Sequence, residues 1–414
     1  MSSKSKTAAT LDEAGPALVP KLRFPEFREA EGWRVKPFGE LFTIGNGRDY
    51  KHLDAGDVPV YGSGGYMLSV NEYLYDGESV CIGRKGTINN PMFLSGRFWT
   101  VDTLFYTHSF KECLPKFIFA IFQQIDWLKH NEAGGVPSLS KTNIEKIKTA
   151  VPKPAEQQKI AECLNSVDEL MAAQARKVDA LKTHKKGLMQ QLFPREGETQ
   201  PRLRFPEFQN TGEWKPTSFG ALGLDVSDGN YSSKYPSQSD FVANGVPFLR
   251  ANNLKFGTVS DDDMRFISKE QHSQITKGHL KQGDILITTR GELGTVALVP
   301  ARHIGSNINA QIVRINSGNK LVNTFLFQLL DYSRVIGLFD ALSTGTALKQ
   351  LPIGKLNQLA LRIPEIREEQ ERIASCLSSL DALITAETQK LETLKIHKKG
   401  LMQQLFPSPE EVEA

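Results

Sequence analysis

Two long stretches of the chain place apolar residues at alternating spacings of four and three. The first stretch contains Ile160, Leu164, Val167, Met171, Gln174, Val178, Leu181, Lys185, Leu188 and Leu192; the second contains Ile373, Leu377, Leu380, Ile384, Glu387, Leu391, Leu394, Lys398, Leu401 and Leu405. This heptad spacing, kept over about five heptads, predicts two long helices that pair as a coiled coil. The alternative is two separate amphipathic helices, although an average globular helix has only about 11–12 residues.

Polar and glycine residues interrupt both stretches at matching places. The polar seam residues are Gln174 and Lys185 in the first stretch, and Glu387 and Lys398 in the second. Polar residues on a seam fix register and orientation at some cost in stability. Gly187 and Gly400 also match, and a helical glycine costs about 1 kcal/mol relative to alanine. We expect another backbone to approach these glycines closely, or the helices to end before them.

The matching places belong to an internal repeat. The segment HKKGLMQQLFP occurs unchanged at 184–194 and 397–407, and LRFPEF occurs at 22–27 and 203–208, followed by Trp33 and Trp214. Between these landmarks the halves diverge. The repeat predicts a tail at 1–19, a variable domain at 20–150, a shared helix at 151–195, a second variable domain at 202–362, a second shared helix at 363–407, and a tail at 408–414.

The variable domains have the pattern of mixed α/β structure. Short β-rich runs bounded by Gly, Asp and Asn occur at 79–83, 98–108, 284–289 and 309–315. Apolar stretches at 116–128 and 323–339 are predicted to be helical. A weak match pairs 56–65 with 244–253, and another pairs 76–87 with 282–293, which aligns Arg84 with Arg290.

Composition excludes several classes of protein. The chain has 414 residues, of which 40% are hydrophobic and 23% charged, with a net charge of +3; these values are typical of a globular protein. No apolar run approaches the roughly 18–20 residues that span a bilayer, and the N-terminus lacks a signal-peptide core. We therefore expect a cytoplasmic protein that is not in a membrane. The four cysteines include no CxxC pair, which argues against a structural zinc site or a redox motif.

The sequence offers no convincing catalytic site. YGSGGY at 61–66 lacks the spacing of dinucleotide and phosphate loops. NNPMF at 89–93 lacks the second proline of the methyltransferase motif that it faintly resembles, and no histidine has metal-ligand spacing. We therefore predict no catalytic residue and no metal site.

Basic and polar residues near glycine-rich turns remain as candidates for binding DNA. Arginine suits guanine edges, asparagine suits adenine edges, and lysine and backbone amides suit phosphates. The alternative is that these are solvated turn residues. The candidates are Arg48, Tyr50, Lys51, Ser63, Gly64, Tyr66, Arg84, Lys85 and Lys141 in the first domain, and Asn230, Tyr231, Lys234, Arg250, Asn252, Asn253, Arg290 and Lys349 in the second.

Together these features resemble the specificity subunit of type I restriction–modification systems. The resemblance rests on LRFPEF and tryptophan at the start of each half, on VPKPAEQQKIA and IPEIREEQERIA before the helices, and on HKKGLMQQLFP at their ends. It implies two mixed α/β (α+β) target recognition domains, separated by two helices that form an antiparallel coiled coil with pseudo-two-fold symmetry.

The resemblance also implies the function and the partners. Such a subunit is not an enzyme: it recognises double-stranded DNA with two half-sites and an unread spacer. It guides two modification subunits that use S-adenosylmethionine, and restriction subunits that use ATP and Mg, so no cofactor is expected in this chain. A stand-alone DNA methyltransferase or nuclease, and a coiled-coil scaffold that binds protein, are the alternatives.

The ends of the two helices carry more apolar surface than one seam needs. We expect part of this surface to bind the modification subunits. The residues concerned are Leu188, Met189, Leu192, Phe193, Leu401, Met402, Leu405 and Phe406.

Overall fold

The computed structural model describes residues 18–229, 234–255, 257–345, 349–408 and 412. The chain divides into two compact units, one formed by residues up to 173 together with those from 391, and one formed by residues 174–390. The division therefore passes through both long helices, so each unit contains a variable domain, part of the helix that precedes or follows it, and part of the other helix.

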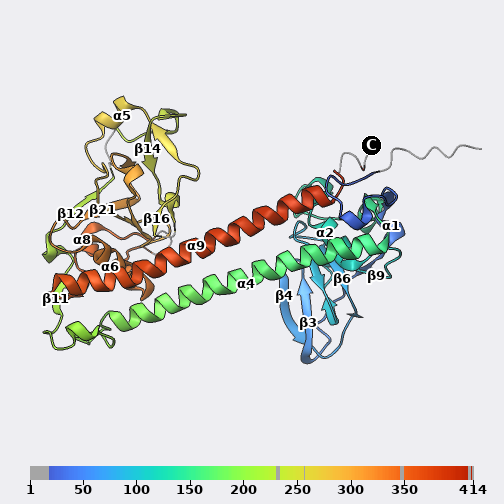
Figure 1. The fold of residues 1–414 in the computed structure, drawn as a ribbon, viewed down its shortest axis with the longest axis horizontal. Coiled ribbons are helices and arrows are strands. Elements are labelled where there is room, and N and C mark those ends of the chain that lie inside the picture. The colour runs from blue at the N-terminus through green and yellow to red at the C-terminus, as the bar shows by residue number, and fades with distance from the viewer. Residues whose placement is uncertain (1–17, 230–233, 256, 346–348, 409–411, 413–414) are drawn as a thin grey trace, which may run out of the picture. The chain divides into compact units, whose positions relative to one another are not determined.

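The two long helices are α4 (Pro154–Leu192) and α9 (Arg367–Leu405), each of 39 residues. Figure 1 shows each as one unbroken helix, α4 in green and α9 in orange-red. Every predicted seam position is buried or half-buried, whereas Leu170 and Leu383 just outside the seam are exposed. The prediction from the heptad spacing is confirmed.

The helices run antiparallel, and their seam contacts repeat. In the second unit Lys185 Nζ lies 2.7 Å from a carboxylate oxygen of Asp381. In the first unit Lys398 Nζ lies 2.7 Å from a carboxylate oxygen of Asp168. Asp168 and Asp381 hold equivalent places in the repeat, as do Lys185 and Lys398, so one ion pair is made twice.

The first unit is built on two four-stranded sheets in its described residues. Its strands are β1 (Arg34–Pro37), β2 (Thr43–Asn46), β3 (Ala55–Gly62), β4 (Gly65–Val70), β5 (Tyr75–Asp76), β6 (Ser79–Gly83), β7 (Met92–Leu94), β8 (Arg97–Thr100), β9 (Leu104–His108) and β10 (Lys148–Val151). The sheet orders are β2-β9-β6-β7 and β4-β3-β8-β5, and β1 pairs with β10. The helices are α1 (Phe38–Leu41), α2 (Pro115–Phe122) and α3 (Lys141–Lys146).

The helix expected at 116–128 is shorter than predicted. It ends at Phe122, and a separate 3-10 turn follows at Trp127–His130. The indole Nε1 of Trp127 donates to the carbonyl of Phe122 at 2.9 Å. This bond folds the chain back after α2 and buries the ring of Trp127, which an extended helix would not do.

The second unit repeats this plan. Its strands are β11 (Lys215–Ser218), β12 (Asp225–Asp228), β13 (Phe241–Val242), β14 (Val246–Leu249), β15 (Leu254–Lys255), β16 (Thr258–Val259), β17 (Arg265–Ile267), β18 (Ile285–Thr288), β19 (Val296–Leu298), β20 (Asn307–Ile308), β21 (Ile312–Asn316) and β22 (Ala360–Ile363). The sheet orders are β12-β21-β18-β19 and β13-β17-β14-β20, β15 pairs with β16, and β11 pairs with β22. The helices are α5 (Lys269–Gln274), α6 (Asn323–Val335), α7 (Leu338–Leu342) and α8 (Ile353–Leu356).

The strand register shows that the two domains share one framework. In the first domain Asn46 pairs with Phe105, Gly83 with Leu104, and Tyr61 with Thr100. The equivalent pairs of the second domain are Asp228 with Val313, Thr288 with Ile312, and Leu249 with Ile308. The sheet β2-β9-β6-β7 therefore corresponds strand by strand to β12-β21-β18-β19, although the sequences differ.

A buried ion pair ties the start of each domain to its own long helix. Arg23 donates to both carboxylate oxygens of Glu156 at 2.8 and 2.7 Å, and the indole of Trp33 donates to the same carboxylate at 3.3 Å. The second unit repeats the arrangement with Arg204, Glu369 and Trp214, at 2.8, 2.8 and 3.2 Å. Bidentate pairs of this kind are strong and specific in geometry, so the fold itself explains why these residues recur.

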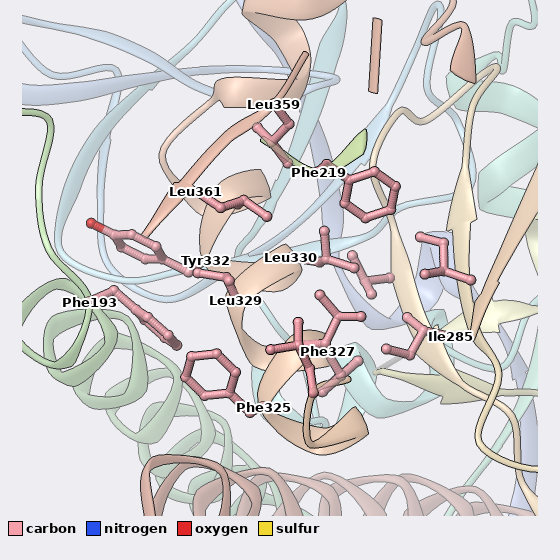
Figure 2. Close-up of a cluster of buried hydrophobic side chains, with 14 of the residues drawn as sticks. Phe193, Phe219, Ile285, Phe325, Phe327, Leu329, Leu330, Tyr332, Leu359 and Leu361 are labelled. Carbon is pink, nitrogen blue, oxygen red and sulfur yellow. The ribbon is translucent and has the colours of Figure 1, made fainter. Parts of the chain in front are cut away.

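Six of the eight apolar residues at the helix ends are buried within the chain, which corrects our expectation for those six that they contact partner subunits, whereas Leu188 and Leu401 are half-buried. Met189, Leu192 and Phe193 belong to the main core of the second unit, with Leu188 packed against it; Met402, Leu405 and Phe406 belong to that of the first unit, with Leu401 packed against it. Figure 2 shows Phe193 beside Tyr332 and Phe325, with ring centroids 5.0 and 5.9 Å apart. The domains need these side chains to cover α2 and α6.

Gly187 and Gly400 are not explained by either of our expectations. Both lie inside helices that continue to Leu192 and Leu405. A Cβ atom placed on either glycine would meet no described atom within 4 Å. Within the chain, each glycine therefore weakens its helix and permits no closer packing.

Candidate nucleic-acid interface

Loops of the first domain meet at the segment that joins β8 to β9. The amide of Arg48 donates to the carbonyl of Thr100 at 2.8 Å, and the amide of Val101 donates to that of Tyr61 at 2.9 Å. The amide of Arg84 donates to the carbonyl of Thr103 at 2.8 Å. The loops that follow β2 and β6 and the end of β3 are therefore held to this segment by backbone hydrogen bonds. We call this place the loop junction of the first domain.

The loop junction of the second domain has the same construction. The amide of Asn309 donates to the carbonyl of Leu249 at 2.8 Å, as Val101 does to Tyr61. The amide of Thr289 donates to the carbonyl of Gln311 at 2.7 Å. The side chains at the two junctions differ, but these backbone hydrogen bonds are the same.

This register corrects the alignment of Arg84 with Arg290. The amides of Arg84 and Thr289 make equivalent bonds, and their carbonyls accept equivalent bonds from Leu139 and Leu351, at 2.9 and 3.0 Å. Arg84 is therefore equivalent to Thr289, and Arg290 is equivalent to Lys85. The sequence match paired Gly77 with Gly283, which also pairs Gly83 with Thr289. The strand register of β6 and β18 instead pairs Gly83 with Thr288, so the match was wrong by one residue.

Glycines make the close approaches at each junction. A Cβ atom on Gly47 would lie 1.9 Å from the carbonyl oxygen of Val101, and one on Gly229 would lie 2.2 Å from that of Asn309. Gly86 and Gly291 have φ of +85° and +78°, a conformation that residues with a Cβ rarely adopt. The same two special backbone positions therefore recur in both domains.

Several predicted residues of the first domain gather at its junction. Arg48, Lys85 and Gly64 are exposed there, and the Oγ of Ser63 lies 3.4 Å from a Cβ position on Gly86. Arg84 is half-buried, with its guanidinium 5.9 Å from the ring centre of Phe105.

Other predicted residues of this domain have different surroundings. Tyr66 is 62% exposed on β4, and its hydroxyl lies 3.2 Å from Ser69 Oγ. Lys51 is exposed, whereas Tyr50 packs against a small core beneath β3. Lys141 is half-buried and lies 3.7 Å from Glu145.

In the second domain the predicted residues are more often engaged by the fold. Arg250 donates to Asp263 at 2.7 Å, and Lys349 lies 3.0 Å from Asp340. Asn252 and Lys234 are exposed, and Arg290 is half-buried. Asn230 and Tyr231 lie outside the described residues.

Asn253 was wrongly predicted to read DNA. Its side chain is fully buried. Its Oδ1 accepts from the amide of Arg250 at 3.0 Å, and its Nδ2 donates to the carbonyls of Ser260 and Asp262 at 3.2 and 2.9 Å. Asn253 therefore closes a turn: both hydrogens of its Nδ2 are used within the chain, and its burial keeps the side chain from a base edge.

Sequence reasoning missed the equivalence of Lys85 and Arg290, although each residue was a candidate. The signal was the glycine that follows each of them. Among the described residues there is no cluster of three or more His, Cys, Asp or Glu side chains placed to hold a metal ion. Nor does that part of the chain contain a helix long and apolar enough to cross a membrane.

Comparison with known proteins identifies related chains. A family model described as the type I restriction modification DNA specificity domain matches residues 30–183 and 225–395. The chain is 25% identical over 344 residues to the type I restriction enzyme MjaVIII specificity subunit of Methanocaldococcus jannaschii, covering 80% of this chain and 77% of that protein. It is 21% identical over 344 residues to the putative specificity subunit S.HindORF215P of Haemophilus influenzae, covering 81% and 83%.

Solved structures share the fold. The S subunit of a type I restriction–modification system from M. genitalium has a TM-score of 0.62 at 14% identity, covering 94% of this chain and all of that one. A chain from a study of complex assembly in a type I system has a TM-score of 0.52 at 16% identity, covering 91% and 98%.

Proposed function

The chain belongs to the type I restriction–modification DNA specificity family, and we propose that it reads a double-stranded DNA target in two halves, one per domain. The observation that carries the proposal is the pair of equivalent loop junctions. They share strand register and glycine positions, yet Tyr61 and Arg84 of the first junction have Leu249 and Thr289 as their equivalents. A common frame with different side chains suits two surfaces that read different bases.

We also propose that the outward face of the repeated helix ends binds two copies of one modification subunit. Exposed residues of this face are identical in both copies: His184 and His397, Lys186 and Lys399, and Gln191 and Gln404. Exposed pairs nearer the middle of the helices differ, as Glu169 and Ala382 do. Packing within the chain does not require exposed residues to be identical, but two identical partners would require it.

The chemistry is proposed to reside in the partners. The two repeats occupy nearly the whole chain, which leaves little room for a catalytic domain. S-adenosylmethionine would be bound by modification subunits, and ATP and Mg by restriction subunits. The four cysteines are free thiols, which suits the reducing cytoplasm that we propose as the location.

Replacing one recognition domain tests the function. Residues 202–362 would be exchanged for the matching domain of another family member, and methylated adenines would be mapped in the DNA of cells that also express the modification subunit. We expect one half of the methylated sequence to change and the other half to persist. A change in both halves, or in neither, contradicts the proposal.

Two rival functions are tested with purified protein. Methyl transfer or DNA cleavage by this chain alone would support a stand-alone enzyme. DNA affinity of the assembled complex that does not fall with salt would support a protein-binding scaffold, because neutralising phosphates makes affinity strongly salt-dependent.

A further inference from the structure

The two recognition domains carry a basic residue at the same position of the same turn. Lys85 follows β6 by two residues, and Arg290 follows β18 by two residues. The segments before them are held by equivalent hydrogen bonds from the amides of Arg84 and Thr289. Lys85 forms an isolated bridge with Ser138, and Arg290 forms one with Gln350.

The residue after each basic residue completes the match. Gly86 and Gly291 both have the left-handed φ that favours glycine. Each turn therefore has the same backbone hydrogen bond before the basic residue and the same kind of φ after it, so the backbone presents the side chains of Lys85 and Arg290 from equivalent positions.

Neighbouring positions at the junction do not keep their chemistry. Arg84 has Thr289 as its equivalent, and Tyr61 has Leu249. General similarity between the domains therefore does not explain why a cation persists at the one position. The fold of the first domain does not explain it either, since the side chain of Lys85 is exposed and its residue joins the structure through its backbone.

The nature of the exchange indicates what the cation meets. Lysine and arginine are not interchangeable where a planar group must bind two acceptors of a guanine, but both can place a positive charge beside a phosphate. The phosphate backbone is also the part of the DNA that is the same at both half-sites, whatever their bases.

We propose that Lys85 and Arg290 each contact a DNA phosphate and orient their domain on its half-site, leaving the bases to the differing positions around them. This inference rests on the proposed function, in which each domain reads one half-site. Lys85 and Arg290 are then positioning residues, and they contribute affinity without contributing sequence preference.

The test measures salt dependence in the assembled complex of this chain and its modification subunits. Dissociation constants would be measured over a series of salt concentrations for a duplex with the methylated sequence and for a scrambled duplex of equal length. Each phosphate contact contributes about 0.9 to the slope of log affinity against log salt. We expect Lys85→Ala and Arg290→Ala each to lower the slope by about 0.9, and the double variant by about twice as much.

Other readouts separate this role from its rivals. Lys85→Arg and Arg290→Lys should retain the wild-type slope, and Lys148→Ala, an exposed change on the β1–β10 ribbon, should not alter it. The ratio of affinities for the two duplexes, and the methylated sequence in cells, should be unchanged in every variant.

Three outcomes would overturn the inference. An unchanged slope in both alanine variants would show that neither side chain contacts a phosphate. A changed base at one half-site of the methylated sequence in an alanine variant would show that the replaced residue reads bases. A lowered salt slope in both Lys85→Arg and Arg290→Lys would show that the shape of the charged group matters as well as its charge. If the wild-type complex itself bound DNA without salt dependence, the proposed function would fail instead.

Discussion

Gln174 and Glu387 are equivalent residues of the repeat, 213 positions apart, and they bind each other: Gln174 Nε2 donates to Glu387 Oε2 at 2.8 Å. Residues at equivalent positions of two antiparallel helices contact each other only at the two-fold axis that relates the helices. A strictly identical pair would place two carboxylates there, or two amides. The exchange of one carboxylate for an amide replaces charge repulsion with a hydrogen bond.

The carboxylate of Glu387 should make the coiled coil sensitive to acid. Its hydrogen bond from Gln174, with those from Lys177 and Lys390, lowers the pKa of Glu387 from 4.5 to about 2. A depressed carboxyl pKa stabilises the fold above pH 4.5, and this contribution is lost as the pH falls from 4.5 towards about 2. We expect Glu387→Gln to lower the melting temperature at neutral pH, and the difference from wild type to shrink through that range. A difference independent of pH would contradict the assignment.

The two copies of the seam ion pair should differ in strength. Lys185 is buried and lies 3.3 Å from Asp331 as well as 2.7 Å from Asp381, whereas Asp168, the partner of Lys398, is half-exposed. Lys185→Met removes the cation that Asp381 and Asp331 share, although Asp331 keeps its pair with Arg334 at 2.6 Å, and should lower the free energy of unfolding by about 3 kcal/mol. Lys398→Met should cost less, about 1 kcal/mol, because the Asp168 side chain is 43% exposed, although that of Lys398 is only 13% exposed. Chemical denaturation of both variants measures this, and equal losses would show that burial does not distinguish the copies.

A charge at the end of α9 should unfold the first domain. Met402 is buried in the core of the first unit, so Met402→Asp places a carboxylate where water cannot solvate it. We expect a loss of more than about 4 kcal/mol of stability, seen by hydrogen exchange in β6 and β9. Gln403→Asp, on the exposed side of the same turn, is the control. If the Met402→Asp chain folds but does not bind the modification subunits, Met402 belongs to a partner interface, as the sequence analysis predicted.

The helical glycines should be replaceable in the free chain but not in the complex. Gly187→Ala and Gly400→Ala meet no described neighbour and should each stabilise the chain by about 1 kcal/mol. Gly187→Leu and Gly400→Leu should leave the chain folded and impair binding of modification subunits, if those subunits approach the proposed outward face. Native mass spectrometry would detect the loss, and full assembly of the leucine variants would argue against this face.

Lengthening both helices should lengthen the unread spacer. One heptad inserted after Val178 and one after Leu391 adds about 10 Å to each helix, which equals about 3 bp of duplex. The added base pairs also turn the far half-site by about a third of a turn, so overall methylation should fall. Sites that are still methylated should keep both half-sites and have a longer spacer. Undiminished methylation at the original spacing would show that the helices do not set the distance.

Local periodicity made the helices predictable, but contacts distant in sequence were not. Seam positions from Ile160 to Leu405 follow from spacing alone, since a helix places every third or fourth residue on one face. The burial of Met189 and Met402 could not be predicted, because apolar residues at a helix end suit a partner surface and a core equally well. The buried pair of Arg23 with Glu156 was visible only as residues that recur.

The sequence predicted which types of residue are candidates for binding DNA, but not where each of them lies in the fold. Basic residues beside glycines were found, but Asn253 was taken for a base reader because its burial in a turn depends on Asp262 and Ser260. Lys85 and Arg290 were misaligned by one residue. A difference of one residue in loop length is hard to detect when two diverged sequences are aligned. Hydrogen bonds between strands fix the register, so they show which residues are equivalent.

The last turns of α9 complete the core of the first domain, and this has a consequence for synthesis. On the ribosome the first domain emerges early, but Met402, Leu405 and Phe406 follow Phe193 by about 210 residues. At about 5–20 residues per second this delay is on the order of 10–40 s. During that time the rings of Trp33 and Phe117, which pack against Phe406, lack their cover. The nascent chain therefore carries an exposed apolar patch that a chaperone could hold, and a premature stop codon near the 3′ end of the gene would damage the domain encoded at the 5′ end.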